Sequence, residues 1–206
     1  MRRLILSLAA LLALSACAEP VWAPDEAVAA AAYVHDRPPA ITLFTLINNR
    51  SGSGAHSGLM INGSQRVMFD PAGSWGLPRL PERNDLHYGM TEKMVNFYID
   101  YHARETFRVV EQTIVVSPLV AELALQRATA FGAVPKARCS SSVANILRGV
   151  PGFESIPGTM FPKALMTAFG ELPGVTSRTI TDDDADDNHG VLIVQTNETA
   201  TDAVTQ

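Results

Sequence analysis

The sequence predicts an α+β domain in which a small antiparallel sheet packs against helices. Short segments rich in β-branched and aromatic residues alternate along the chain with segments whose apolar residues recur at helical spacing. Two early strand-like segments are separated by Asn62-Gly63-Ser64, which is typical of a hairpin turn. The length of 206 residues, with 47% hydrophobic and 18% charged residues, fits one globular domain.

Six segments are expected to form strands because they are apolar, rich in β-branched or aromatic residues, and bounded by turn residues. They are residues 41–47, 55–61, 66–70, 107–116, 177–181 and 190–195. The first is apolar throughout and indicates a buried strand, and the last two could pair with each other. The proline-rich residues 71–89 are expected to form a loop.

Four segments are expected to be helical because their apolar residues share one face. They are residues 91–105, 117–131, 139–148 and 162–169. Thr91 can cap the first helix, and Ser117-Pro118 supplies a capping residue and a first-turn proline to the second. The domain therefore covers residues 41–195, and the polar residues 196–206 are expected to form a flexible tail.

Residues 1–16 have the organisation of a bacterial lipoprotein signal peptide. Two arginines precede an apolar run of about 11 residues, much shorter than the roughly 20 that span a bilayer. The run ends in Leu14-Ser15-Ala16-Cys17, which resembles a lipobox, so Cys17 is the expected lipidation site. An ordinary signal peptide cut at Ala16 or Ala18 is the alternative. We expect a protein anchored by lipid to a membrane of the bacterial cell envelope and facing the periplasm, with inner or outer membrane left open.

Residues 17–40 are expected to form the lipidated N-terminus and a Pro/Ala-rich tether. Prolines on both sides isolate the alanine-rich residues 27–32, in which a short helix can form. Such a segment would keep the domain near the membrane but would not be part of the folded domain.

The charge of the chain excludes one class of partner. The formal net charge is −5, and removing the two leader arginines leaves 14 basic against 21 acidic residues, or −7. The sequence shows no basic cluster that could neutralise phosphates on one face. Nucleic acid is therefore not an expected partner.

Cys139 is the only thiol left in the mature chain if Cys17 carries lipid. It opens a predicted helix and follows Lys136 and Arg138, and the unpaired N–H groups and dipole of a helix start stabilise a thiolate. A histidine nearby would activate it as a nucleophile. The alternative is a small, buried and inert core residue.

His56 lies on a predicted strand with Gly58 two residues later, in Gly54-Ala55-His56-Ser57-Gly58. A His-x-Gly strand followed by a cysteine at a helix start resembles the circularly permuted papain-like thiol hydrolases. That group includes relatives of lecithin retinol acyltransferase and permuted bacterial cell-wall peptidases or amidases. The resemblance covers about residues 41–150. It implies a papain-like fold in permuted order, with Cys139 as nucleophile and His56 as general base.

The third catalytic position of that family lies on the strand paired with the histidine strand. A three-residue loop at Asn62-Gly63-Ser64 would place Asp70 opposite His56, on the same face of the sheet. A two-residue loop would place Pro71 there instead. The family often has histidine or an amide here, and an Asx-turn before Pro71 is the alternative for Asp70.

Ser140 or the backbone N–H of Cys139 could form an oxyanion hole, although small residues also suit an ordinary helix start. No metal or cofactor is expected: His87 and His102 lack metal-ligand spacing, and residues 182–188 resemble a calcium loop except that His189 stands where glycine is required. An acidic hairpin turn is expected at 182–188 instead.

The sequence thus predicts an envelope lipoprotein with a Cys-His hydrolase or acyltransferase domain. Its substrate would be a cell-wall peptide or a lipid acyl group, attacked through a thioester acyl-enzyme. The alternatives are a non-catalytic binding or scaffold lipoprotein with a buried cysteine, and a pseudoenzyme whose thiol is accessible but not coupled to a histidine.

Overall fold

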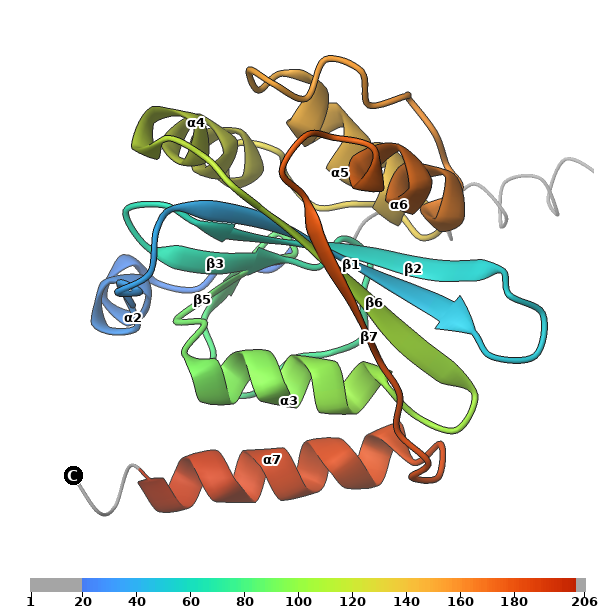
Figure 1. Cartoon of the computed structure of the whole chain (residues 1–206). Helices are drawn as coiled ribbons and strands as arrows, with labels where there is room; N and C mark the ends of the chain where they lie inside the picture. The colour runs from blue at the N-terminus through green and yellow to red at the C-terminus, as the bar shows by residue number, and fades with distance from the viewer. Residues whose placement is uncertain (1–19, 203–206) are drawn as a thin grey trace, which may run out of the picture.

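The computed structural model describes residues 20–202, so the signal peptide 1–16 and the lipidation site Cys17 lie outside the described residues. Figure 1 shows α4 (Pro118–Thr129), α5 (Cys139–Arg148) and α6 (Pro162–Gly170) covering one face of a central sheet. On the other face lies α3 (Glu92–His102), with α7 (Asn188–Asp202) outside it. Within residues 20–202, every helix is too short or too polar to cross a bilayer.

Seven strands form one antiparallel sheet in the order β4-β5-β3-β2-β1-β6-β7. The strands are β1 (Ala40–Asn48), β2 (Gly54–Asn62), β3 (Arg66–Phe69), β4 (Glu82–Arg83), β5 (Leu86–Tyr88), β6 (Phe107–Val115) and β7 (Thr176–Ile180). The helices are α2 (Asp25–Ala30), α3 (Glu92–His102), α4 (Pro118–Thr129), α5 (Cys139–Arg148), α6 (Pro162–Gly170) and α7 (Asn188–Asp202). The α+β class agrees with the prediction.

The sheet is larger than predicted because β4 and β5 lie within residues 71–89, which were expected to be a loop. These strands have two and three residues, too few to show a periodic pattern. They are joined by Asn84 and Asp85, whose φ angles of 49° and 66° fit a two-residue hairpin turn that favours these residue types.

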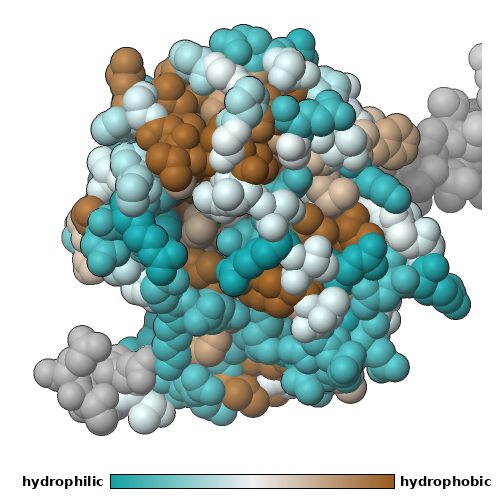
Figure 2. All heavy atoms as spheres, viewed as in Figure 1, coloured by the Kyte–Doolittle hydropathy of each residue, from teal (hydrophilic) through white to brown (hydrophobic). Residues whose placement is uncertain are grey.

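The sheet separates two hydrophobic cores. On β2, Leu59 and Ile61 lie in the core under α4, α5 and α6, whereas Met60 packs against the core on the α3 side. β1 is buried on both faces, with Leu43 in the first core and Phe44 in the second. Figure 2 shows apolar residues gathered over α4 and mostly hydrophilic residues over α7.

The register of the β2–β3 hairpin differs from both predicted registers. Asn62 faces Arg66 and Ile61 faces Val67, so the loop is Gly63-Ser64-Gln65. This register keeps Val67 beside Ile61 in the core and moves the polar Gln65 into the turn, which is the more favourable burial. Continued past Phe69, it brings Asp70 opposite Gly58 rather than opposite His56.

The prediction of a separate tether is wrong for the described part of residues 17–40. Trp22 forms a β-bridge with Arg83 of β4, and α2 follows at Asp25–Ala30, with Val28 packed against the core. Further along, the backbone N–H of Arg66 donates to the carbonyl of Tyr33 at 2.8 Å. The N-terminal segment therefore belongs to the domain, because the edge of the sheet at β4 offers it backbone partners.

The predictions of a strand at 190–195 and a flexible tail at 196–206 are also wrong as far as Asp202, because α7 covers this region. Val191 and Leu192 pack against the α3-side core, and Gln195 is 2% exposed. Val191, Leu192 and Gln195 recur at helical spacing. The β-branched residues between them, Ile193 and Val194, favour a strand, which explains the wrong prediction. Residues 182–187 lead into this helix, so the expected hairpin turn there is wrong too.

We expect Gln195→Ala to lower the free energy of unfolding by about 1–3 kcal/mol, because it leaves buried polar partners unsatisfied. The Gln195 carboxamide accepts from Trp75 Nε1 at 3.2 Å and donates to the Phe97 carbonyl and the Asp100 carboxylate, both at 3.0 Å. Urea unfolding measures the change. Val194→Ala, at a neighbouring position that is 56% exposed, is the matched control and should change stability little. Equal effects of the two substitutions would contradict a docked α7.

Candidate active site

His56, Asp70 and Cys139 come together where β2 runs past the end of β3. β3 pairs with β2 only at residues 59–62, so the earlier part of β2 is left without a strand on that side. Cys139, the first residue of α5, occupies this edge, and the backbone N–H of Ser57 donates to its sulfur. The side chain of His56 reaches the same sulfur.

Asp70 fixes the His56 ring through one oxygen. His56 Nε2 lies 2.6 Å from Asp70 Oδ1, and the Tyr98 hydroxyl donates to the same oxygen at 2.9 Å. Asp70 makes this contact diagonally, from the position opposite Gly58. Because Gly58 has no side chain, Asp70 and Tyr98 can meet there; a Cβ would lie 2.3 Å from the Tyr98 oxygen.

The three ionisable groups shift one another's pKa values. Burial disfavours a charged imidazolium, but Asp70 and then Cys139 outweigh it and raise the pKa of His56 well above its usual value. Burial also opposes a charged carboxylate, yet His56 holds the pKa of Asp70 below its usual range. The groups therefore favour an imidazolium between two anions.

The thiol is biased toward thiolate. Burial alone would raise the pKa of Cys139, but hydrogen bonding and charge from His56 lower it. Ser140 and the Ser57 N–H add to this lowering. Since Nε2 of His56 is held by Asp70, Nδ1 is the nitrogen left to exchange a proton with the sulfur.

Lys136 and Arg138, which were expected to stabilise the thiolate, are exposed side chains. The contacts that lower the pKa of Cys139 come from the His56 ring, the Ser140 hydroxyl and the Ser57 backbone instead.

Ser140 is completely buried beside the thiol. Its hydroxyl lies 3.0 Å from the Ser57 hydroxyl and 3.9 Å from the Cys139 sulfur. α3 and α4 are capped by the side chains of Thr91 and Ser117, whereas α5 has no side-chain cap. The first N–H groups of α5 are thus free of a capping side chain, which favours the backbone over the Ser140 hydroxyl as the oxyanion donor; both remain predictions.

Tyr98 and His102, which lie one turn apart on α3, belong to the site and were not predicted. The His102 ring stacks on His56 with centroids 6.0 Å apart and planes at 11°. Its Nδ1 donates to the Tyr98 carbonyl at 2.7 Å, and burial lowers the pKa of His102 to about 4. The sequence assigned Tyr98 to the core and His102 to a helix end; their i, i+4 spacing beside a predicted histidine strand was the available signal.

Asp85 is a third residue that was not predicted, and it joins the loops that carry Asp70 and Cys139. Its carboxylate accepts the N–H groups of Ala72 at 3.2 Å and Val134 at 2.7 Å, and its carbonyl accepts the Asp70 N–H at 2.8 Å. Val134 stands in the segment that leads to Cys139. Asp85 therefore connects the loop that carries Asp70 with the segment that leads to Cys139.

A separate acidic group lies near α3, formed by Asp100, Asp182 and Asp184, whose carboxylate oxygens lie within 4.8 Å of one another. The Arg104 guanidinium donates to Asp100 at 2.7 Å and to Asp184 at 3.1 Å. Arginine thus supplies positive charge to this group.

In comparisons with known proteins, no family model, no curated protein and no solved structure matched this chain. The chemistry of the site is therefore inferred from its own residues. These residues form a buried carboxylate, an imidazole and a thiol in series, an arrangement suited to nucleophilic catalysis.

We expect the folded protein to lose stability as pH falls from 6.5 to about 4, because of His102. Burial lowers the pKa of His102 from its ordinary 6.5 to about 4, so in this window the unfolded chain binds a proton that the folded chain does not. The contribution is on the order of 3 kcal/mol. Urea unfolding across this range should show a shallower loss in His102→Phe, which keeps a stacked ring.

His189→Phe is the matched control, because His189 is exposed and loses little hydration on folding. That variant should keep the wild-type dependence on pH. A His102→Phe protein with the wild-type slope would show that His102 is not the responsible group.

Proposed function

We propose that this chain is a cell-envelope lipoprotein, lipidated at Cys17, with a circularly permuted papain-like thiol hydrolase or acyltransferase domain. One observation carries the proposal: Asp70 holds one nitrogen of the His56 ring at 2.6 Å while the ring reaches the sulfur of Cys139. The chain order of His56, Asp70 and Cys139 is that of the permuted enzymes, and the thiol stands at a helix start beside the sheet. The charges and hydrogen bonds that the three groups share favour a preformed thiolate–imidazolium pair.

In the proposed reaction the Cys139 thiolate attacks the acyl carbon and forms a C–S bond. The carbonyl electrons move to oxygen, and the N–H groups at the start of α5 are placed to stabilise that charge. The tetrahedral intermediate collapses, the bond to the leaving group breaks, and His56 gives its proton to the leaving amine. Water or another acceptor then attacks the thioester, His56 takes the acceptor's proton, and Cys139 is regenerated.

The proposed substrates are amide bonds of cell-wall peptides. A domain anchored by lipid and facing the periplasm works beside the cell wall, where such peptides are abundant acyl donors. Acyl groups of membrane lipids are the other substrate class within the same chemistry, since a thioester forms from an ester as well as from an amide.

A second function is favoured by one observation: Cys139 is only 8% exposed. In that case the domain is a non-catalytic binding or scaffold lipoprotein that retains a buried thiol. The two functions differ in whether the thiol reacts in the folded protein.

We expect Cys139 to react with iodoacetamide well below the ordinary thiol pKa of about 8.5. A chain that begins at Ala18 keeps every described contact and has this single thiol. In His56→Ala the pH profile of the alkylation rate should shift toward that of an ordinary thiol, because the imidazolium is lost. Asp70→Asn should shift it in the same direction by less.

Intact mass follows the alkylation at each pH. Reaction only on unfolding would favour the scaffold lipoprotein. Identical profiles in wild type and His56→Ala would indicate a pseudoenzyme with an uncoupled thiol.

Incubation with cell-wall peptide fragments should give a covalent adduct whose mass equals the acyl portion of the substrate, and hydroxylamine should release it. Cys139→Ala should form no adduct, and His56→Ala should slow its formation by roughly 10²–10⁴-fold, the usual contribution of a general acid–base. Asn145→Ala, an exposed position on the same helix, is the matched control and should keep full activity. An adduct that persists in Cys139→Ala would contradict the assignment of the nucleophile.

A further inference from the structure

The N-terminal segment is fastened to the edge of the sheet from Val21 onward. Its backbone pairs with β4: the Ala23 N–H donates to the Glu82 carbonyl at 2.9 Å, and the Asn84 N–H donates to the Val21 carbonyl at 3.0 Å. The Arg83 guanidinium donates to the Ala23 carbonyl at 2.8 Å. This segment is thus held as an added edge strand.

Arg83 also binds the segment through side chains. Its guanidinium pairs with the Asp25 carboxylate at the start of α2 and lies 4.6 Å from the centre of the Trp22 ring. These contacts fix the segment on both sides of its bridge with β4.

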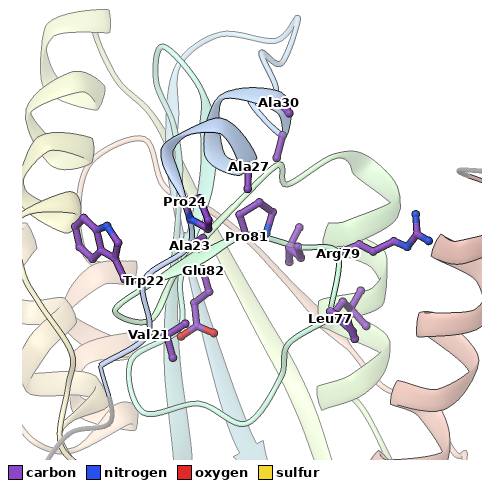
Figure 3. Close-up of a pocket in the computed structure, with 13 residues that line it drawn as sticks. Val21, Trp22, Ala23, Pro24, Ala27, Ala30, Leu77, Arg79, Pro81 and Glu82 are labelled. Carbon is purple, nitrogen blue, oxygen red and sulfur yellow. The ribbon is translucent and has the colours of Figure 1, made fainter.

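The segment nevertheless exposes apolar surface. Trp22 is 64% exposed and Val21 is 43% exposed. Beside them lies an open groove of about 740 Å³, shown in Figure 3, between the segment with α2 and the loop before β4. Its walls are mostly apolar and include Pro24, Ala27, Ala30, Leu77 and Pro81. Water contact with these groups is unfavourable, so the surface fits an apolar partner.

The position of this surface along the chain identifies the partner. Cys17 precedes Val21 by four residues, which span about 14 Å at most. If Cys17 carries acyl chains in a membrane, as the proposed function holds, the fixed segment cannot move farther than this from the bilayer surface. Tryptophan favours the membrane interface, where its ring is buried and its N–H stays hydrated.

We propose that Val21, Trp22 and the adjacent groove form a docking surface for the phospholipid bilayer. The lipid anchor then holds the domain in one orientation, with the β4 edge of the sheet against the membrane. Four strand spacings of about 4.8 Å separate the N-terminal segment from β2, so His56 lies roughly 19 Å across the sheet from this edge. The inference rests on the lipidation of Cys17 and does not depend on catalysis.

The test uses the full lipidated protein in vesicles of phosphatidylethanolamine and phosphatidylglycerol, with or without bromine on the acyl chains near the headgroup. Brominated lipid should quench a large share of the tryptophan emission in the wild type. Trp22→Phe should abolish the quenching, because the remaining Trp75 is only 3% exposed. Unchanged emission of the wild type on brominated lipid would overturn the docking surface.

A relocated tryptophan provides the matched control. Phe161 is 73% exposed and precedes Pro162, which packs against Gly54 at the start of β2, so it lies across the sheet from the β4 edge. Trp22→Phe combined with Phe161→Trp should show no quenching. Quenching at position 161 equal to that at position 22 would overturn the proposed orientation.

Intact mass separates this inference from the proposed function. A protein that carries lipid on Cys17 but shows no quenching of Trp22 contradicts the docking surface and leaves the anchor intact. A protein without lipid on Cys17 and without quenching contradicts both. Alkylation of Cys139 reports on the catalytic proposal in every case.

Discussion

The ion pair between the buried Asp70 and the partly buried His56 is the interaction on which the candidate site depends. Asp70 is 1% exposed, and an isolated carboxylate at that depth is strongly destabilising. His56 Nε2 and the Tyr98 hydroxyl both meet the single oxygen Oδ1, at 2.6 and 2.9 Å, and compensate the lost hydration of that oxygen, whereas the buried Oδ2 has no hydrogen-bond partner among the described residues. Rotation of the His56 ring would remove Nε2 from Asp70 and leave the buried carboxylate without its ionic partner. The other nitrogen of His56 is therefore held toward Cys139 by the cost of burying Asp70.

That ion pair constrains the packing around it. A Cβ on Gly73 would lie 1.8 Å from Asp70 Oδ2, so the backbone passes against the carboxylate only because glycine stands there. Tyr98 is in turn fixed by the core, with its ring 5.5 Å from Phe44 and 5.3 Å from Trp75. The α3-side core thus orients a tyrosine, which orients the carboxylate and through it the imidazole. Packing far from the thiol therefore determines where the His56 ring lies.

Short-range patterns in the sequence predicted those parts of the site that depend on neighbouring residues alone. The helix that begins at Cys139 was predicted with its observed bounds, because its apolar residues repeat at helical spacing. Asp70 was identified as the partner of His56 from the wrong register, since registers two residues apart place it on the same face. His102 could not be placed, because its stacking depends on how α3 crosses the sheet. The edge pairing of Trp22 depends on a strand of two residues, which leaves no signal.

The short turn between β4 and β5 connects the two ends of the proposed function. The Asn84 N–H donates to the Val21 carbonyl, while Asp85 accepts the N–H groups of Asp70 and Val134. Two adjacent residues thus contact the N-terminal segment, the strand end that orients His56, and the segment that leads to Cys139. The N-terminal segment and the candidate site therefore belong to one hydrogen-bonded unit, and under the proposed lipid anchor the fold would set the orientation of His56 and Cys139 relative to the membrane.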